Sequence, residues 1–246
     1  MLSSAALKNS DENKDEVLKL IYECKDALLI CEKIQQRISK SSEEVIKELN
    51  DNGLNMQSGG RHITSFPQIP NLEEDVTNYL INIKRAIGKV CYLVEKFLPV
   101  EKRDNNLDHI IKSINKLDDA KYDNIIEFLN NYKEGVKHLI ELRNYQEHPG
   151  ETLTNIENYK LMPDGKISVP YWYITGKEPS SIVDEMESAI DYVIVLNETM
   201  IVHLIFLVKD AVIPYFIEEI PDKDVDKKMH IKYSLSIDIS RLNIEK

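Results

Sequence analysis

Apolar residues recur at three- and four-residue steps over most of this chain, and this spacing constrains its fold more than any other feature. Such spacing places apolar side chains along one face of an α-helix. The N-terminal example spans residues 11–49, with the apolar set Val17, Leu20, Ile21, Cys24, Leu28, Cys31 and Ile34. The sequence therefore predicts one long amphipathic helix over residues 11–49.

Similar spacing predicts four more helices, over residues 71–98, 104–117, 118–147 and 180–213. Asn71 is expected to cap the first of these with its side chain, and Glu74 completes a capping-box spacing. Ser180 or Ser181 is expected to cap the last helix, which Pro214 kinks or ends. These segments predict an all-α fold, a bundle of four to five helices.

Two segments lack the helical spacing. Residues 148–179 are rich in Pro and Gly and predict a loop with a short hairpin around Asp164-Gly165, inserted before the last long helix. In the tail, residues 221–246, strict alternation over 233–239 suits a strand that needs a partner. The tail is thus either an extension packed on another subunit or disordered. We expect residues 1–246 to form a single helical domain.

The charge balance, −11 for the whole chain, argues against a protein that coats nucleic acid by broad electrostatics. Eight acidic residues and one basic residue lie within 180–220, whereas 71–148 carries fourteen acids and twelve bases. The middle of the chain is therefore nearly neutral. Within it, Lys84, Arg85, Lys89 and Lys96 form a basic cluster, which predicts either a solvated face or a binding patch.

The cysteine count and the apolar stretches bear on location and cofactors. Cys24, Cys31 and Cys91 make neither a disulfide framework nor a zinc site, and no metal-ligand spacing or phosphate loop is present, so we expect no cofactor. The stretch Thr199–Val208 is too short for a membrane span and predicts a buried helix. The N-terminus lacks the pattern of a signal peptide. A cytoplasmic protein without a membrane partner is expected.

The segment with residues suited to chemistry is Arg143-Asn-Tyr-Gln-Glu-His-Pro-Gly150, where a predicted helix ends. On a straight helix, Arg143 and His148 would be separated by about 140°. Because Pro149 disfavours helical geometry at His148, the chain should leave the helix there and bring the imidazole round. His148 suits general acid or base work near neutral pH, and Arg143 suits phosphate oxygens. Asn144 can position either group.

This segment resembles the signature of the HEPN-domain family (higher eukaryotes and prokaryotes nucleotide-binding), which is Arg, a polar residue and then His. The resemblance is close at Arg143, Asn144 and His148 and loose over residues 71–215. It implies a HEPN-like helical bundle and a metal-independent endoribonuclease that cleaves RNA by 2′-hydroxyl attack. It also implies a homodimer with two facing motifs, acting as a toxin with an antitoxin or in antiviral defence. RNA affinity should be weak and salt-sensitive.

Further residues are candidates for substrate contact: Tyr145, Trp172 and Lys89. An exposed Trp172 could stack on unpaired bases, whereas a buried one would attach the insertion to the helices. The looser pattern Arg-x4–6-His also occurs at Arg103 and His109, which form a reserve motif.

Simpler explanations exist for the main motif. Arg143 and Glu147 have the i, i+4 spacing of an ordinary helical ion pair. His148 before Pro149-Gly150 can serve as a helix C-cap donor. The alternative function is then a non-catalytic HEPN-like helical module that binds a protein or nucleotide partner.

Overall fold

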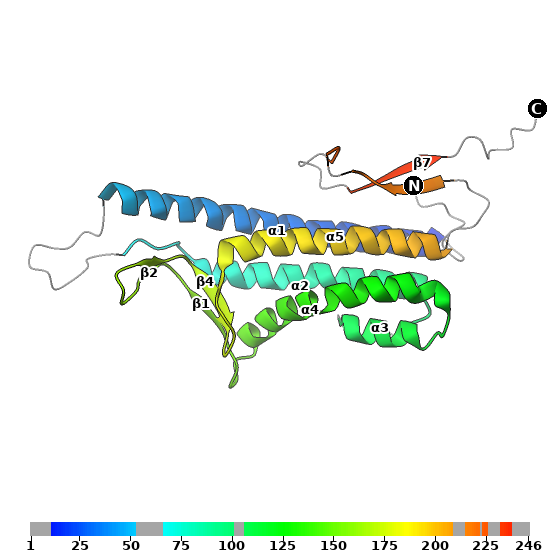
Figure 1. Ribbon diagram of the computed structural model, residues 1–246, viewed down its shortest axis with the longest axis horizontal. Coiled ribbons are helices and arrows are strands. Elements are labelled where there is room, and N and C mark those ends of the chain that lie inside the picture. The colour runs from blue at the N-terminus through cyan, green and yellow to red at the C-terminus, as the bar shows by residue number, and fades with distance from the viewer. Residues whose placement is uncertain are drawn as a thin grey trace, which may run out of the picture. The chain divides into compact units, whose positions relative to one another are not determined.

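A computed structural model describes residues 11–52, 66–100, 106–208, 215–221, 223–225 and 232–237 (Figure 1). Its helices are α1 (Asp11–Asn52), α2 (Leu72–Phe97), α3 (Leu107–Asn115), α4 (Asp123–Glu147) and α5 (Ile182–Val208), with a 3-10 turn η1 (Ala120–Tyr122) before α4. The helical character predicted from the apolar spacing is confirmed for all five.

The largest shift in helix boundaries lies between α3 and α4. The Asn106 side chain accepts a hydrogen bond from the amide of Asp108 (2.9 Å) and caps α3, which therefore begins at Leu107, three residues after the predicted start. The Asp119 side chain likewise accepts from the amide of Lys121 (3.0 Å) and begins η1. These local caps place the helix ends where the apolar spacing alone could not.

Helix α1 buries most of the stripe that the sequence predicts, whereas Leu20 and Ile21 are half-buried. Val17, Cys24, Leu28, Cys31 and Ile34 are all buried. The Cys24 thiol lies 3.7 Å from the carbonyl oxygen of Ala86. Burial raises the pKa of Cys24 to about 12, against a lowering effect of Lys89. These cysteines therefore act as small core residues.

The start of α2 differs from the expected capping box. Asn71 has a positive φ of 54°, in the left-handed region, whereas a side-chain cap needs extended backbone. Its carbonyl oxygen accepts the first helical bond, from Asp75 (3.0 Å). Asn is one of the few residue types that adopt this conformation readily, which explains its presence here.

The insertion folds as β-structure. Strands β1 (Thr154–Glu157), β4 (Tyr171–Ile174) and β5 (Ser180–Ser181) form an antiparallel sheet in the order β1-β4-β5. The predicted hairpin is confirmed as β2 (Lys160–Leu161) and β3 (Ile167–Ser168), with Gly165 at φ 81° in the turn. The chain is thus mainly helical, as predicted, but it contains a β insertion and is not all-α.

The tail contains the strand that its alternation predicts, β7 (Tyr233–Ile237). Its partner is β6 (Tyr215–Glu219) of the same chain, paired in antiparallel fashion from Tyr215↔Ile237 to Glu219↔Tyr233. The expectation that the tail either packs on another subunit or is disordered is therefore wrong for this strand. The residue Pro214, expected to end the last helix, lies outside the described residues.

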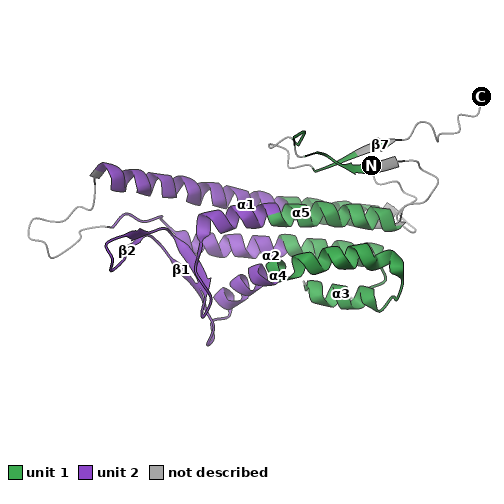
Figure 2. Cartoon of the chain, in the orientation of Figure 1, with its two compact units in different colours: residues 1–25, 86–136, 192–246 green, residues 26–85, 137–191 purple. Residues whose placement is uncertain are grey.

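The chain divides into two compact units (Figure 2). Unit 1 comprises Met1–Lys25, Ala86–Val136 and Tyr192–Lys246, and unit 2 comprises Asp26–Arg85 and Lys137–Asp191. Helices α1, α2, α4 and α5 each begin in one unit and end in the other, so neither unit is a continuous stretch of chain. The β1–β5 insertion and the end of α4 both belong to unit 2.

Helix α5 is less buried than its apolar sequence predicts. Leu196, Met200 and Leu204, at i, i+4 and i+8, are buried on one face, but the side chain of Phe206 is 49% exposed. The prediction that Thr199–Val208 is a buried helix therefore holds for one face of the segment only. Within the described part of the chain, Ile182–Leu207 is the one helical segment long and apolar enough to cross a membrane, judged by length and composition.

Candidate functional site

The predicted motif lies at the C-terminal end of α4. The helix ends at Glu147, and the amide of His148 still donates to the carbonyl oxygen of Asn144 (2.9 Å). His148 is therefore the first residue past the helix, as Pro149 predicts. Its side chain is 76% exposed and can move toward a substrate.

One carboxylate brings the two catalytic candidates together. Glu147 Oε2 forms an ion pair with Arg143 Nη1 and lies 3.4 Å from Nε2 of His148. Arg143 and His148 thus converge on a single oxygen position rather than on opposite faces of the helix. An i, i+4 ion pair of this kind contributes about 0.3–0.5 kcal/mol, so it does not hold the arginine firmly.

A lysine from α2 completes the polar cluster. Lys84 Nζ donates to Oδ1 of Asn144 (2.8 Å), and Arg143 Nη1 lies 3.5 Å from the same oxygen. Oδ1 of Asn144 therefore contacts the basic side chains of both Lys84 and Arg143. We call Lys84, Arg143, Asn144, Glu147 and His148 the motif cluster.

Lys89, the lysine selected from the sequence, lies elsewhere. It belongs to unit 1, where its Nζ lies 2.5 Å from Glu23 Oε2. The sequence shows Lys84 as one of several basic residues on this helix but does not single it out. Because Lys84 and Asn144 are 60 residues apart, no local spacing predicts their contact.

An open cavity of about 620 Å³ lies in the same unit. Its lining residues come from the segment before α2, the first turns of α2 and the β1 region: Gln68, Ile69, Asn71, Leu72, Glu73, Glu74, Thr77, Ile156 and Asn158. The side-chain amide of Gln146, within the motif segment, donates to the hydroxyl of Thr77. The last turn of α4 therefore reaches the edge of this cavity.

Two aromatic candidates take different positions. Tyr145 is half-buried on α4. Trp172 is fully buried, with its ring centroid 6.2 Å from that of Tyr79. A fully buried indole has no free face for an RNA base, so Trp172 is not a stacking residue. The alternative, that it attaches the insertion to the helices, agrees with its packing.

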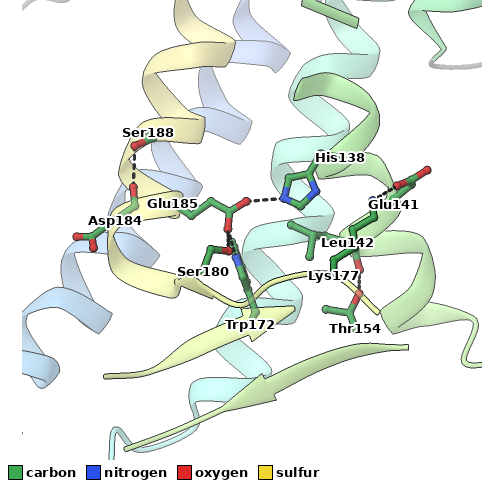
Figure 3. A network of polar contacts seen from close by, with 10 residues as sticks. All are labelled: His138, Glu141, Leu142, Thr154, Trp172, Lys177, Ser180, Asp184, Glu185 and Ser188. Carbon is green, nitrogen blue, oxygen red and sulfur yellow. Dashed lines mark hydrogen bonds and ion pairs between the residues drawn. The ribbon is translucent and has the colours of Figure 1, made fainter. Parts of the chain in front are cut away.

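The indole nitrogen of Trp172 leads to a network that the sequence does not reveal (Figure 3). Glu185, in the first turn of α5, accepts hydrogen bonds from Trp172 Nε1 and from the Ser180 hydroxyl, both through Oε2. Its Oε1 lies 2.6 Å from Nε2 of His138 on α4. One carboxylate thus links β4, β5, α4 and α5. His138 and Glu185 are 47 residues apart, and no spacing signal connects them.

The hydrogen bonds decide the charge state of Glu185. Burial disfavours its ionised form, but hydrogen bonds from His138, Ser180 and Trp172 outweigh that effect and hold the pKa of Glu185 below its ordinary value. The carboxylate is therefore a charged, fully engaged acceptor. We assign it a structural role, because its oxygens are already occupied by protein donors.

The remaining candidates are placed as follows. His109, of the reserve motif, is exposed on α3, and Arg103 lies outside the described residues. In the part of the chain that the structure describes, no three His, Cys, Asp or Glu side chains gather at metal-binding distances.

No family model, curated protein or solved structure matches this chain. The resemblance to HEPN domains accordingly rests on Arg143, Asn144 and His148 and on the helical pattern around them.

Proposed function

We propose that this protein is a metal-independent endoribonuclease that cleaves RNA through attack of a 2′-hydroxyl on the adjacent phosphodiester. The observation that supports the proposal is the convergence of Arg143 and His148 on one oxygen of Glu147. A phosphate oxygen at that position would lie within reach of both a permanent cation and a titratable base.

Each group of the motif cluster has a role in this reaction. His148 takes the proton of the 2′-hydroxyl while the 2′-oxygen bonds to phosphorus. Arg143 stabilises the charge that develops on the phosphorane oxygens, and Lys84 adds to the positive potential. Asn144, which contacts both cations, positions them. The bond between phosphorus and the 5′-oxygen then breaks, and that oxygen takes a proton from water, which yields a 2′,3′-cyclic phosphate and a 5′-hydroxyl.

The test is RNA cleavage by the purified full-length protein in EDTA. We expect Arg143→Ala and His148→Ala each to lower the cleavage rate by about 100-fold or more, since each removes one stabilising or proton-transfer group. His109→Ala is the matched control: it removes an exposed histidine of the reserve motif and should leave the rate unchanged.

Cleavage that persists in both Arg143→Ala and His148→Ala would overturn this mechanism. Loss of cleavage in His109→Ala instead would move the site to the reserve motif. Gel analysis of the 3′ ends provides a second check, because a 2′,3′-cyclic phosphate requires the 2′-hydroxyl, and 2′-deoxy substitution at the cleaved position should abolish the reaction.

The wider setting follows from the family resemblance and remains part of the proposal. It comprises a homodimer with two motif clusters facing each other, and a cytoplasmic role as a toxin held by an antitoxin or as a defence effector. With a net charge of −11, the chain should bind RNA weakly, and the affinity should fall as salt concentration rises.

A second candidate function is a non-catalytic helical module that binds a partner. One observation favours it: the β2–β3 hairpin and the residues beside it expose Leu161, Met162, Ile167 and Val169 within nine positions. Exposed apolar groups concentrated in this way are typical of protein-binding surfaces. This function would be supported if the wild-type protein cleaves no RNA and binds a partner, and if Val169→Ser abolishes that binding.

A further inference from the structure

We propose that Glu147 occupies the place of the RNA phosphate in the free protein and must release Arg143 before substrate binds. This inference rests on the proposed ribonuclease function, since it assigns a role to a residue of the same cluster. It makes Glu147 a residue that sets substrate affinity rather than one that takes part in the chemistry.

The geometry points to Glu147 as a stand-in for phosphate. Carboxylate and phosphate oxygens are alike in charge and in the way a guanidinium binds them. Oε2 of Glu147 is the oxygen that contacts Arg143 and lies 3.4 Å from His148. A non-bridging phosphate oxygen needs that same position, between the cation and the base. The two anions therefore exclude each other.

The environment of Glu147 indicates that it competes with the substrate and does not assist it. As the last residue of α4 it faces the negative end of the helix dipole, where a carboxylate is disfavoured. The Glu147 side chain is 45% exposed, whereas Arg143 is 19% exposed, so the carboxylate can turn into solvent while the arginine stays in place. At 3.4 Å its contact with His148 is too long to orient the imidazole firmly.

The competition between Glu147 and phosphate should lower the affinity of the protein for RNA. A guanidinium already paired with Glu147 offers fewer donors to RNA, so part of the binding energy goes into displacing the carboxylate. Glu147→Gln keeps the size of the side chain and removes its charge. We expect this variant to bind RNA about twofold more tightly, the factor that corresponds to a weak i, i+4 ion pair that RNA no longer has to break.

The experiment is a double-mutant cycle on the full-length protein. Dissociation constants for a labelled single-stranded RNA, 2′-deoxy at the cleavage position, are measured at low salt for four proteins: wild type, Glu147→Gln, Arg143→Ala and the double variant. If Glu147 acts through Arg143, Glu147→Gln tightens binding in the wild-type background and has no effect in Arg143→Ala.

Glu141→Gln is the matched control. It removes the same charge from the same helix, but Glu141 pairs with Lys177 (2.9 Å) and not with Arg143. If Glu141→Gln and Glu147→Gln raise the RNA affinity equally, the effect comes from net charge alone, and the inference is overturned. Weaker binding by Glu147→Gln would also overturn it, because Glu147 would then assist the substrate.

A second probe separates this inference from the ribonuclease proposal. Inorganic phosphate is titrated into the same proteins while the guanidinium resonance of Arg143 is followed by NMR. If wild type cleaves no RNA but Glu147→Gln binds phosphate more tightly through Arg143, the anion competition stands and the ribonuclease proposal fails. If wild type cleaves RNA and Glu147→Gln leaves both phosphate and RNA binding unchanged, the competition is wrong and the ribonuclease proposal survives.

Discussion

Glu185 connects the β insertion to helices α4 and α5 through one carboxylate. Its carboxylate is the acceptor for the buried indole nitrogen of Trp172 and for the Ser180 hydroxyl. Removing it would leave the indole donor buried without a partner, and an unsatisfied buried donor costs about 1–3 kcal/mol. We expect Glu185→Ala to lower the free energy of unfolding at neutral pH by at least that amount, measured by urea denaturation.

The pH dependence of stability provides a sharper test of the same carboxylate. Because the folded pKa of Glu185 lies below the unfolded value of about 4.3, its ionised form stabilises the native state. That contribution is complete well above the unfolded pKa and is lost as the pH falls through the folded pKa. The stability difference between wild type and Glu185→Gln should therefore shrink between about pH 6 and pH 2.

Glu187→Gln is the control for this series, since Glu187 is an exposed carboxylate on the same helix. It should differ little from wild type at any pH. A Glu185→Gln difference that stays constant from neutral to acid pH would contradict the role of its charge.

At the residue scale, the sequence reveals only those site residues that are close together along the chain. Arg143, Asn144 and His148 fall within six positions, so their spacing and the following proline could be interpreted directly. Lys84 and Glu185 join their partners across 60 and 47 residues. Such contacts depend on how distant elements pack together, and they leave no local pattern in the sequence.

Among the secondary-structure elements, the helices were predictable and most strands were not. The apolar spacing identifies α1 because its stripe is buried on one side along its length. Strands β1 and β4 pair Thr154 with Ile174 across an intervening hairpin, so their sheet depends on a non-local register. Strand β7 was predictable since its residues alternate strictly, whereas β6, Tyr215–Glu219, shows no such alternation.

Helices α4 and α5 also meet closely in unit 1. A Cβ on Gly135 would lie 2.5 Å from Oη and 2.7 Å from Cζ of Tyr192. That hydroxyl donates to the carbonyl oxygen of Tyr132 (2.8 Å), and the two rings are 4.6 Å apart. Gly135→Ala gains about 1 kcal/mol in helix propensity but displaces the Tyr192 ring, which costs about 1–3 kcal/mol.

We therefore expect Gly135→Ala to destabilise the protein, as measured by its thermal midpoint. In a Tyr192→Leu background the same change should be stabilising, because only the gain in propensity remains. Destabilisation by Gly135→Ala in both backgrounds would mean that the close approach to Tyr192 is not the cause.

For the whole molecule, four helices continue from one compact unit into the other. Helix α1, for example, runs without interruption through Lys25, which belongs to unit 1, and Asp26, which belongs to unit 2. Unfolding of one unit would break these shared helices partway along their length. We therefore expect the whole protein to unfold in a single cooperative transition. Trp172 is the only tryptophan and lies in unit 2, whereas far-ultraviolet circular dichroism reports helices in both.

The two signals should therefore give coincident urea midpoints. Unit 2 unfolding first would appear as a fluorescence transition that precedes the loss of helical signal, and that result would contradict cooperative coupling.

The buried cysteines have a practical consequence for work on this protein. All three thiols are shielded from solvent, and burial raises the pKa of Cys91 to about 12, with Glu95 adding to the shift. Thiolate is the form that reacts with maleimides, so the three native cysteines should hardly react with such reagents. A cysteine introduced at the exposed Glu151, just beyond the motif, would then accept a fluorophore or a crosslinker selectively. Labels placed there would show by energy transfer whether two chains bring their motif segments together.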